Sequence, residues 1–445
     1  MATSSKSISR RGFLGTATAA SAATALPAWF RESSESRLFA QETSPNERPR
    51  VALVGCGGMG TGDAKNAQRF GDVVAVCDVD AERLGKASET FKGAKGYDDY
   101  RQLCDDNGID VVINGTPDHW HTLVNLRALR SGKDVYSEKP LTLTIDEGRH
   151  VVAAVKEHGR ILQTGSQQRS DAKFRLACEL VRNGRLGKID RAKVWLPAGF
   201  NEGPFPPEPV PAGLDWDRWL GQAPKVEYTT KRCHLFFRYW WDYSGGTMTD
   251  WGAHHNDIVL WGLGKDRGGP TSVEGRPLVE PIPGGYTAAA QYDVKYVYDD
   301  GTEHLCRSTT SNTFSGGVAH EPAEGERHHG VQFEGPKGWI YVTRGKIEAS
   351  DPSLLDEPLD SNAERLYASD DHMGNFFDCV KTRKAPICEA EIGHRSASLC
   401  HLGTIGIRLG RRLEWDPAAE EFKNDPEANG YVAREQRKPY SYDEA

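Results

Sequence analysis

Short apolar runs recur through the first third of the chain, and stretches of helical composition separate them. The apolar runs lie at residues 51–54, 73–77, 111–114, 134–137 and 161–164. Helical composition fills residues 81–91, 97–107, 116–132 and 151–157. Strands that alternate with helices in this way are typical of a parallel sheet with helices on both faces. We therefore expect a doubly wound α/β domain over residues 50–166.

Beyond residue 166 the apolar positions alternate with polar ones. This alternation covers residues 288–298, 301–307, 330–334 and 339–343, and Asp299-Asp300-Gly301 has the composition of a hairpin turn. Helices are expected at 172–183, 372–382 and 395–409, with a strand at 189–196 and a Pro-rich loop at 203–211. The pattern predicts a second α/β domain, residues 167–415, with a large, open, mostly antiparallel sheet. Residues 416–445 are expected to form a polar tail on the surface.

A glycine-rich turn follows the first apolar run. Gly55, Gly57 and Gly60 stand in G-x-G-x-x-G register, with Gly58 and Met59 inside the motif. In a Rossmann domain the first glycine permits the tight turn, the second lets the backbone approach a pyrophosphate, and the third allows close packing of the next helix. The phosphates would then lie on the free amides that open this helix. The sequence therefore predicts a dinucleotide site here.

The second apolar run ends in Asp78. An acidic residue at about this spacing after the glycine motif accepts hydrogen bonds from the ribose hydroxyls of NAD. A carboxylate at this position repels the 2′-phosphate of NADP. We therefore expect NAD, while the nearby Arg83 leaves NADP open as the less favoured alternative.

Length and composition limit the number of domains, the kinds of partner and the metal or disulfide sites that the chain can have. The chain has 445 residues, more than one core usually holds, so two domains and a leader are expected. The net charge of −8 argues against nucleic acid or an anionic membrane as the main partner. Nine cysteines without a C-x-x-C pair signal neither a zinc site nor a disulfide framework, and we predict no metal.

The leader carries a twin-arginine pattern, Arg10-Arg11-Gly12-Phe13-Leu14, followed by an Ala-rich stretch at residues 16–28. The stretch is too short and too rich in small residues for a stable membrane span, and it is typical of an export signal. Cleavage could follow Ala25, Ala28 or Ala40, and the Leu38-Phe39-Ala40 sequence favours the last. We expect a leader over residues 1–40, a linker over 41–49 and a periplasmic protein. Because twin-arginine export carries folded proteins, the cofactor should be loaded first and held tightly.

Two further stretches supply groups for proton transfer. Lys139 follows the strand at 134–137, and ligands of parallel sheets bind beyond the carboxyl ends of their strands. Asp250 and His254 are four residues apart, so on a helix they share one face and the carboxylate could orient the imidazole. A metal site at His254, His255 and Asp257 is disfavoured because adjacent histidines on a helix point about 100° apart. Aromatic residues between 236 and 251 could pack as core or face a sugar.

These motifs together resemble the Gfo/Idh/MocA family, named after glucose-fructose oxidoreductase, inositol dehydrogenase and a rhizopine catabolism protein. The resemblance rests on the glycine motif, on Thr116-Pro117-x-x-x-His121, on Glu138-Lys139-Pro140 and on Gly246-x-x-x-Asp250-x-x-x-His254. It covers residues 50–415 and implies a Rossmann domain followed by an α/β domain whose open sheet often joins subunits, so a homo-oligomer is expected. The exported members that this chain resembles have mostly unassigned substrates.

By this resemblance, Lys139, Asp250 and His254 form the catalytic group. Thr116, Pro117, His121 and Glu138 line the cofactor, and the Lys139–Pro140 bond is expected to be cis. Arg169, Trp251 and His255 are expected on the substrate side.

The resulting hypothesis is an exported, NAD-dependent oxidoreductase that transfers hydride between a tightly bound nicotinamide and a hydroxyl carbon of a sugar, glycoside or polyol. One alternative is an NAD-dependent glycosidase that oxidises C3 transiently and then eliminates the aglycone. Another is a sugar-binding protein that retains the fold without catalysis.

Overall fold

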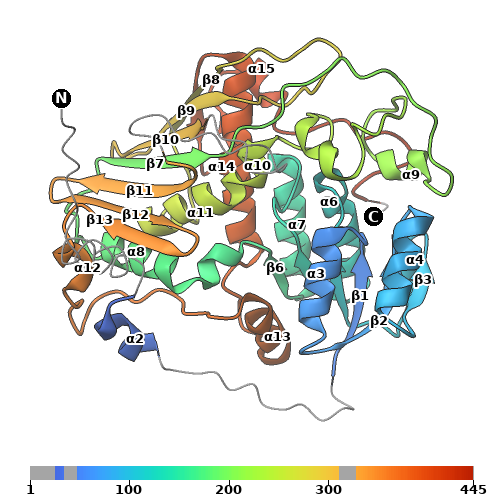
Figure 1. Ribbon diagram of the computed structural model, residues 1–445, viewed down its shortest axis with the longest axis horizontal. Helices are drawn as coiled ribbons and strands as arrows, with labels where there is room; N and C mark the ends of the chain where they lie inside the picture. Colours follow the sequence, from blue (N-terminus) through green and yellow to red (C-terminus); the bar gives the residue numbers. More distant parts are fainter. Residues whose placement is uncertain (1–25, 35–47, 310–326, 444–445) are drawn as a thin grey trace, which may run out of the picture.

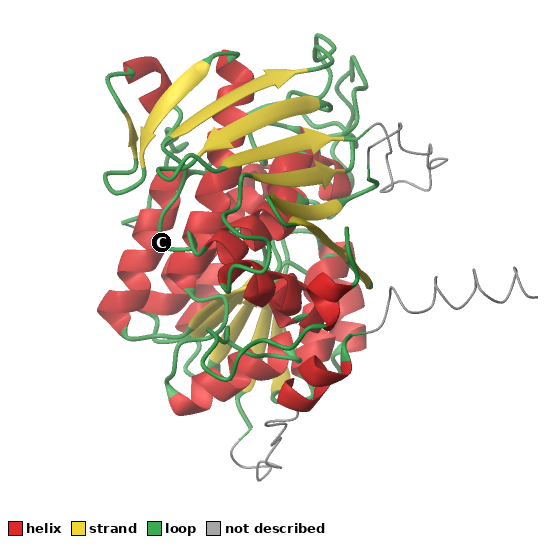
Figure 2. Ribbon diagram, turned by 90° about the vertical axis from the view of Figure 1, so that its left-hand side faces the viewer, coloured by secondary structure: helices red, strands yellow, loops and turns green. Residues whose placement is uncertain are grey.

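The computed structural model describes residues 26–34, 48–309 and 327–443 (Figure 1). The twin-arginine pattern lies outside these residues. Two sheets organise the described chain, with helices packed between and around them (Figure 2). Within the described residues no helix is long and apolar enough to cross a membrane. All nine cysteines are described, and they are buried and free.

The first sheet has six parallel strands in the order β3-β2-β1-β4-β5-β6. The strands are β1 (Arg50–Val54), β2 (Asp72–Cys77), β3 (Lys95–Tyr97), β4 (Val111–Asn114), β5 (Asp134–Ser137) and β6 (Leu162–Thr164). Both faces are buried, which explains the continuous apolar runs. Helices α3 (Gly58–Ala67), α4 (Ala81–Thr90) and α13 (His372–Thr382) cover one face, and α5 (Tyr100–Asp105), α6 (Asp118–Arg130) and α7 (Ile145–His158) cover the other. This arrangement confirms the predicted Rossmann domain.

The second sheet has nine strands in the order β13-β12-β11-β7-β10-β9-β8-β14-β15. They are β7 (Arg191–Leu196), β8 (Ser272–Pro277), β9 (Tyr292–Val297), β10 (Glu303–Ser308), β11 (Gly330–Gly335), β12 (Gly338–Thr343), β13 (Lys346–Ala349), β14 (Arg412–Asp416) and β15 (Glu421–Phe422). Only β7 and β10 pair in parallel, so the sheet is mostly antiparallel, as predicted. Helices α8 (Ala172–Arg182), α11 (Gly252–Leu263) and α14 (Ala390–Leu409) pack on one face with the main hydrophobic core.

The opposite face of this sheet carries ion pairs between neighbouring strands. Lys193 Nζ lies 2.6 Å from Glu334 Oε1, and Arg276 NH2 lies 3.2 Å from Asp293 Oδ2. Polar positions that alternate with buried ones along each strand thus separate a core face from a charged face.

The remaining elements are short. They are α2 (Ala28–Ser34), the 3₁₀ turn η2 (Gln167–Ser170), α9 (Trp216–Leu220), the 3₁₀ turn η3 (His234–Tyr239), α10 (Thr247–Asp250), α12 (Ser353–Asp356) and α15 (Pro426–Asn429). Helix α2 falls inside the stretch expected to be the leader. The tail departs from the expected surface covering, because Phe422 and Ala428 are buried in the main core.

Candidate cofactor and active site

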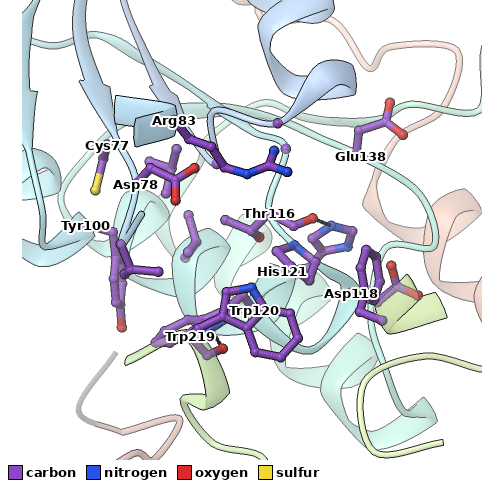
Figure 3. A pocket seen from close by; sticks show the side chains of 18 of the residues that line it. Cys77, Asp78, Arg83, Tyr100, Thr116, Asp118, Trp120, His121, Glu138 and Trp219 are labelled. Carbon is purple, nitrogen blue, oxygen red and sulfur yellow. Dashed lines mark hydrogen bonds between the residues drawn. The ribbon is translucent and has the colours of Figure 1, made fainter. Parts of the chain in front are cut away.

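A cavity of about 420 Å³ lies at the carboxyl ends of β1, β2, β4 and β5. This is the edge where ligands bind in parallel α/β sheets. Among its lining residues are ten that the sequence predicts for the cofactor: Gly55, Gly57, Gly58, Met59, Asp78, Thr116, Pro117, His121, Glu138 and Lys139. Figure 3 shows Asp78 and Arg83 on one side of this cavity, with Glu138 and Asp118 on the other.

The three motif glycines meet different requirements. Gly55 has φ +87°, and a Cβ there would lie 2.6 Å from the backbone nitrogen of Thr116. A Cβ on Gly60 would lie 2.3 Å from the carbonyl oxygen of Gly55, so this glycine is needed for close packing of α3 on β1. At Gly57 a Cβ would meet only the Arg83 guanidinium, at 3.3 Å. The fold therefore requires Gly55 and Gly60, whereas Gly57 keeps space open towards the cavity beside the first amides of α3.

Asp78 is held at the end of β2 by two backbone amides. Cys56 N donates to one carboxylate oxygen at 2.8 Å, and Asp80 N donates to the other at 3.0 Å. Burial raises the pKa of Asp78, while these two amide hydrogen bonds act in the opposite direction. A carboxylate can accept about four hydrogen bonds, so Asp78 can still accept hydrogen bonds from the hydroxyl groups of a ribose. The amides at the start of α3, the acceptor carboxylate of Asp78 and the open space at Gly57 together fit a dinucleotide in this cavity.

Lys139 and Asp250 form a buried ion pair at the other end of the cavity. Lys139 Nζ lies 2.5 Å from Asp250 Oδ1, and the two side chains are 8% and 9% exposed. Arg238 Nε approaches the same oxygen at 3.5 Å. Burial alone would raise the pKa of Asp250, but the charges of Lys139 and Arg238 outweigh it and hold that pKa well below its usual range. The Lys139–Pro140 bond is cis, as the resemblance implies.

His254 lies on α11, close to this ion pair but outside the lining of the cavity. Burial, followed by the charge of Lys139, lowers the pKa of His254 well below its ordinary value, so the ring is neutral. Its Nδ1 atom has no hydrogen-bond partner among the described residues. Trp251 separates α10 from α11, and Asp250 bonds to Lys139. The carboxylate therefore acts on the imidazole through its charge, whereas the sequence led us to expect that it orients the ring.

His121 links the two loops that carry the predicted cofactor residues. One ring nitrogen lies 2.7 Å from Pro140 O and the other lies 2.9 Å from Thr116 O. Burial lowers the pKa of His121 to about 4. The ring therefore fixes the position of the Lys139–Pro140 bond relative to the loop after β4.

Asp118 and Arg238 are two of the lining residues that were not among the predicted site residues. Asp118 opens α6, accepts a hydrogen bond from Ser244 Oγ at 2.6 Å, and has its pKa raised by burial to about 7. Arg238 belongs to η3 and interacts electrostatically with Asp250 and Asp118. The sequence signal for Asp118 was an acidic residue directly after Thr116-Pro117. Arg238 stands within the aromatic run at residues 236–251, and only the folded structure shows that it reaches the cavity.

The residues expected on the substrate side lie beside the cavity without lining it. Arg169 is fully buried, with two hydrogen bonds of 2.8 Å to Asp257 and an ion pair of 3.2 Å to Asp266, so its guanidinium ties η2 to α11. His255 is also buried, and its Nε2 lies 3.1 Å from His329 Nδ1. Trp251 is partly buried beneath the guanidinium of Arg344, 4.7 Å from the ring centre.

The aromatic run before Trp251 is mainly core. Phe237, Tyr239, Trp240 and Tyr243 are buried in a cluster with aromatic residues from other parts of the loop. This leaves few of these rings free to face a sugar.

Segments of the second domain cover the cavity from outside. Its lining includes Trp219 of α9, Phe237 of η3 and Tyr440 of the tail. The tail is fastened by Arg437, whose Nε donates to Gly221 O at 2.9 Å and whose NH1 bonds to Asp217 at 2.9 Å. We call residues 213–222 and 434–443 the cover. A dinucleotide in the cavity would be enclosed between the cover and the Rossmann domain.

The fold and the cavity define a dinucleotide-binding protein of two domains, with an ion pair and a neutral histidine near one end of the nucleotide site. Within the described residues there is no group of three or more metal-ligating side chains.

Comparison with known proteins identifies the family. Residues 49–166 match the description "Oxidoreductase family, NAD-binding Rossmann fold", and residues 193–442 match "Oxidoreductase family, C-terminal alpha/beta domain". The chain belongs to the Gfo/Idh/MocA oxidoreductase family, which confirms the resemblance and the expectation of an NAD-binding domain.

Individual relatives are more distant. Myo-inositol 2-dehydrogenase of Thermotoga maritima is 30% identical over 174 residues, which cover 39% of this chain and 49% of that protein. The chain thus spans about half the length of this relative. scyllo-Inositol 2-dehydrogenase (NAD⁺) of Bacillus subtilis is 26% identical over 76% of this chain and 88% of its own length. The WlbA dehydrogenase of Bordetella pertussis, solved with NADH and UDP-GlcNAcA, has a TM-score of 0.62 at 19% identity, covering 82% of this chain and 98% of that one.

Proposed function

We propose that the protein is an exported NAD-dependent oxidoreductase that transfers hydride between a tightly held nicotinamide and a hydroxyl carbon of a sugar, glycoside or polyol. The observation that carries this proposal is the buried Lys139–Asp250 pair at the end of the nucleotide cavity. The dehydrogenase names of the curated relatives support the reaction class, and the two inositol dehydrogenases among them support a polyhydroxylated substrate.

His254 and Lys139 would both take part in proton transfer from the substrate hydroxyl. Nicotinamide, when bound, supplies the hydride chemistry. Neutral His254 has an unpartnered Nδ1 that can accept the hydroxyl proton. Lys139, held by Asp250, would share this proton transfer and stabilise negative charge on the oxygen. Arg238 adds a second positive charge beside the same carboxylate.

Tight retention of the cofactor is supported by the cover. Gly213 O accepts a hydrogen bond from Ala81 N at 2.9 Å, and Asp215 N donates to Val79 O at 3.0 Å, so the cover is attached to the loop after β2. Nucleotide release would require these bonds and those of Arg437 to open. A retained cofactor suits a protein that works outside the cytoplasm, where free NAD is scarce, and it must then be reduced and reoxidised within each cycle.

Nucleotide content and product mass test the proposal together. Protein purified from its producing cells and then denatured should release stoichiometric NAD or NADH. Incubation with a polyol deuterated at its hydroxyl carbons should transfer deuterium to the nucleotide. A protein that releases no nucleotide contradicts tight retention. Cleavage of a glycoside without accumulation of NADH would identify the glycosidase alternative, and binding without any deuterium transfer would identify a non-catalytic binding protein.

We also propose that copies associate through the charged face of the second sheet. This face carries opposite-charge pairs between neighbouring strands, and the Arg276 side chain on it is 70% exposed. Light scattering should give a mass above that of one chain, and Arg307→Glu, which reverses an exposed charge on this face, should lower it. A monomeric mass for the unmodified protein would refute this.

A further inference from the structure

Helix α2 lies within the residues expected to be removed with the leader, yet its side chains pack into the second domain. Phe30 is fully buried and belongs to the main hydrophobic core, which is built mainly from α8, α11, α14 and the second sheet. Leu26 and Trp29 pack against the same core. In Figure 1, α2 lies beside α8 and α12, away from β1, which follows it in the sequence.

Polar contacts fix α2 in the same place. Trp29 Nε1 donates to Leu355 O at 3.1 Å. The guanidinium of Arg175 lies 4.5 Å from the centre of the Phe30 ring, and that of Arg365 lies 5.8 Å from the Trp29 ring. Both arginines also pair with Glu179, at 3.1 Å each.

The Glu179 carboxylate is fully buried, so the two arginines compensate for the loss of water around it. The Phe30 ring packs against the Arg175 guanidinium, and the Trp29 ring lies near that of Arg365, whose side chain is 39% exposed. Removal of α2 would expose an ion network as well as an apolar site. Removal of α2 should therefore destabilise the second domain more than removal of a helix that lies only on the surface.

We propose that residues 26–34 are a structural part of the mature protein and that leader processing takes place between Ala25 and Leu26. Ala23-Thr24-Ala25 has the small-x-small pattern that signal peptidases require. Cleavage after Ala40 would remove all of α2. Cleavage after Ala28 would remove Pro27, whose carbonyl accepts hydrogen bonds from the amides of Phe30 and Arg31.

The inference has a packing half, that α2 belongs to the folded domain, and a processing half, that cleavage follows Ala25. The packing half is independent of the proposed function, whereas the processing half rests on the proposed export. Two chains lacking the leader, residues 26–445 and residues 41–445, separate the two halves. We expect the shorter chain to unfold at a lower Tm, by roughly 5–10 °C, because it loses a buried aromatic side chain. Within the longer chain, Phe30→Ala should reproduce most of this loss, whereas Arg31→Ala, which changes an exposed neighbour on the same helix, should not.

The intact mass of the exported form, made from the full chain in a bacterium with twin-arginine export, identifies the first residue of the mature protein. A mass that begins at Leu26 supports the proposal, and a mass that begins at Gln41 overturns the processing half. Equal Tm values for the two shorter chains overturn the packing half. Absence of any exported form counts against export, and the Tm comparison still decides whether α2 belongs to the folded domain.

Discussion

Replacing Gly57 by alanine separates the requirements of the fold from those of the cofactor. Gly57 has an extended backbone, φ −69° and ψ 179°, which alanine adopts without strain. An added Cβ would contact only the flexible Arg83 guanidinium, at 3.3 Å. We therefore expect Gly57→Ala to fold with nearly unchanged stability. The methyl group would, however, occupy the space through which a pyrophosphate approaches the amides of α3.

The size of the effect follows from the contacts that the methyl group prevents. Hydrogen bonds from amides to a charged group contribute about 1.5–3 kcal/mol each. Loss of one such bond corresponds to a weakening of roughly ten- to hundred-fold in affinity for NAD. Titration of nucleotide-free protein with NADH, followed by nicotinamide fluorescence, measures this difference. Thermal unfolding without nucleotide measures the stability of the same variant.

Gly62 provides the matched control. It lies on α3, directly after the turn that contains Gly57, and a Cβ there would meet nothing within 4 Å. Gly62→Ala should keep nucleotide affinity and gain up to about 1 kcal/mol of stability from helix propensity. Unchanged NADH affinity in Gly57→Ala would refute the assignment of this turn as the phosphate cradle.

Lys139, Arg437 and two buried histidines can be tested in the same way. Lys139→Ala should lower kcat by roughly 10²–10⁴-fold while bound nucleotide is retained, and wild-type turnover would remove this lysine from the mechanism. Arg437→Ala should speed nucleotide loss during dialysis by about tenfold, because it releases the tail from residues 213–222, and an unchanged rate would contradict this role. Burial lowers the pKa of His121 and of His372 to about 4, below the value of about 6.5 in an unfolded chain. The unfolded chain therefore binds more protons as pH falls below about 6.5, and urea unfolding should show a loss of about 2 kcal/mol per histidine between pH 7 and pH 5, whereas a flat profile would contradict it.

The first domain could be predicted closely because its signals are local. Strands β1, β2, β4, β5 and β6 are buried on both faces and therefore read as continuous apolar runs. Strand β3 was missed because it has three residues, Lys95–Tyr97, and two of them are exposed. Strand β8 was missed because Gly275 interrupts its alternation, where a Cβ would lie 2.6 Å from the backbone of Ile407 on α14. That requirement comes from tertiary packing.

The cofactor half of the site was predictable for the same reason, since each residue follows a recognisable strand. The other half depends on contacts between segments far apart in the sequence. Lys139 of the first domain pairs with Asp250 of the second, and Tyr440 reaches the cavity from the tail. Arg169 has the residue type of an anion ligand, yet the fold pairs it with Asp257. A sequence pattern gives the chemistry of a side chain but does not show which partner forms its hydrogen bonds and ion pairs.

Hydride transfer to a bound nicotinamide can be observed by mass spectrometry of the purified protein after incubation with a panel of sugars, polyols and glycosides. The measurement reads bound nucleotide and product together. We expect at least one compound to lose two hydrogens while bound NAD becomes NADH, and Lys139→Ala to slow both changes by at least about a hundredfold without releasing the nucleotide. A protein that carries no nucleotide, or one in which Lys139→Ala converts the compound as fast as the unmodified protein, would contradict the account.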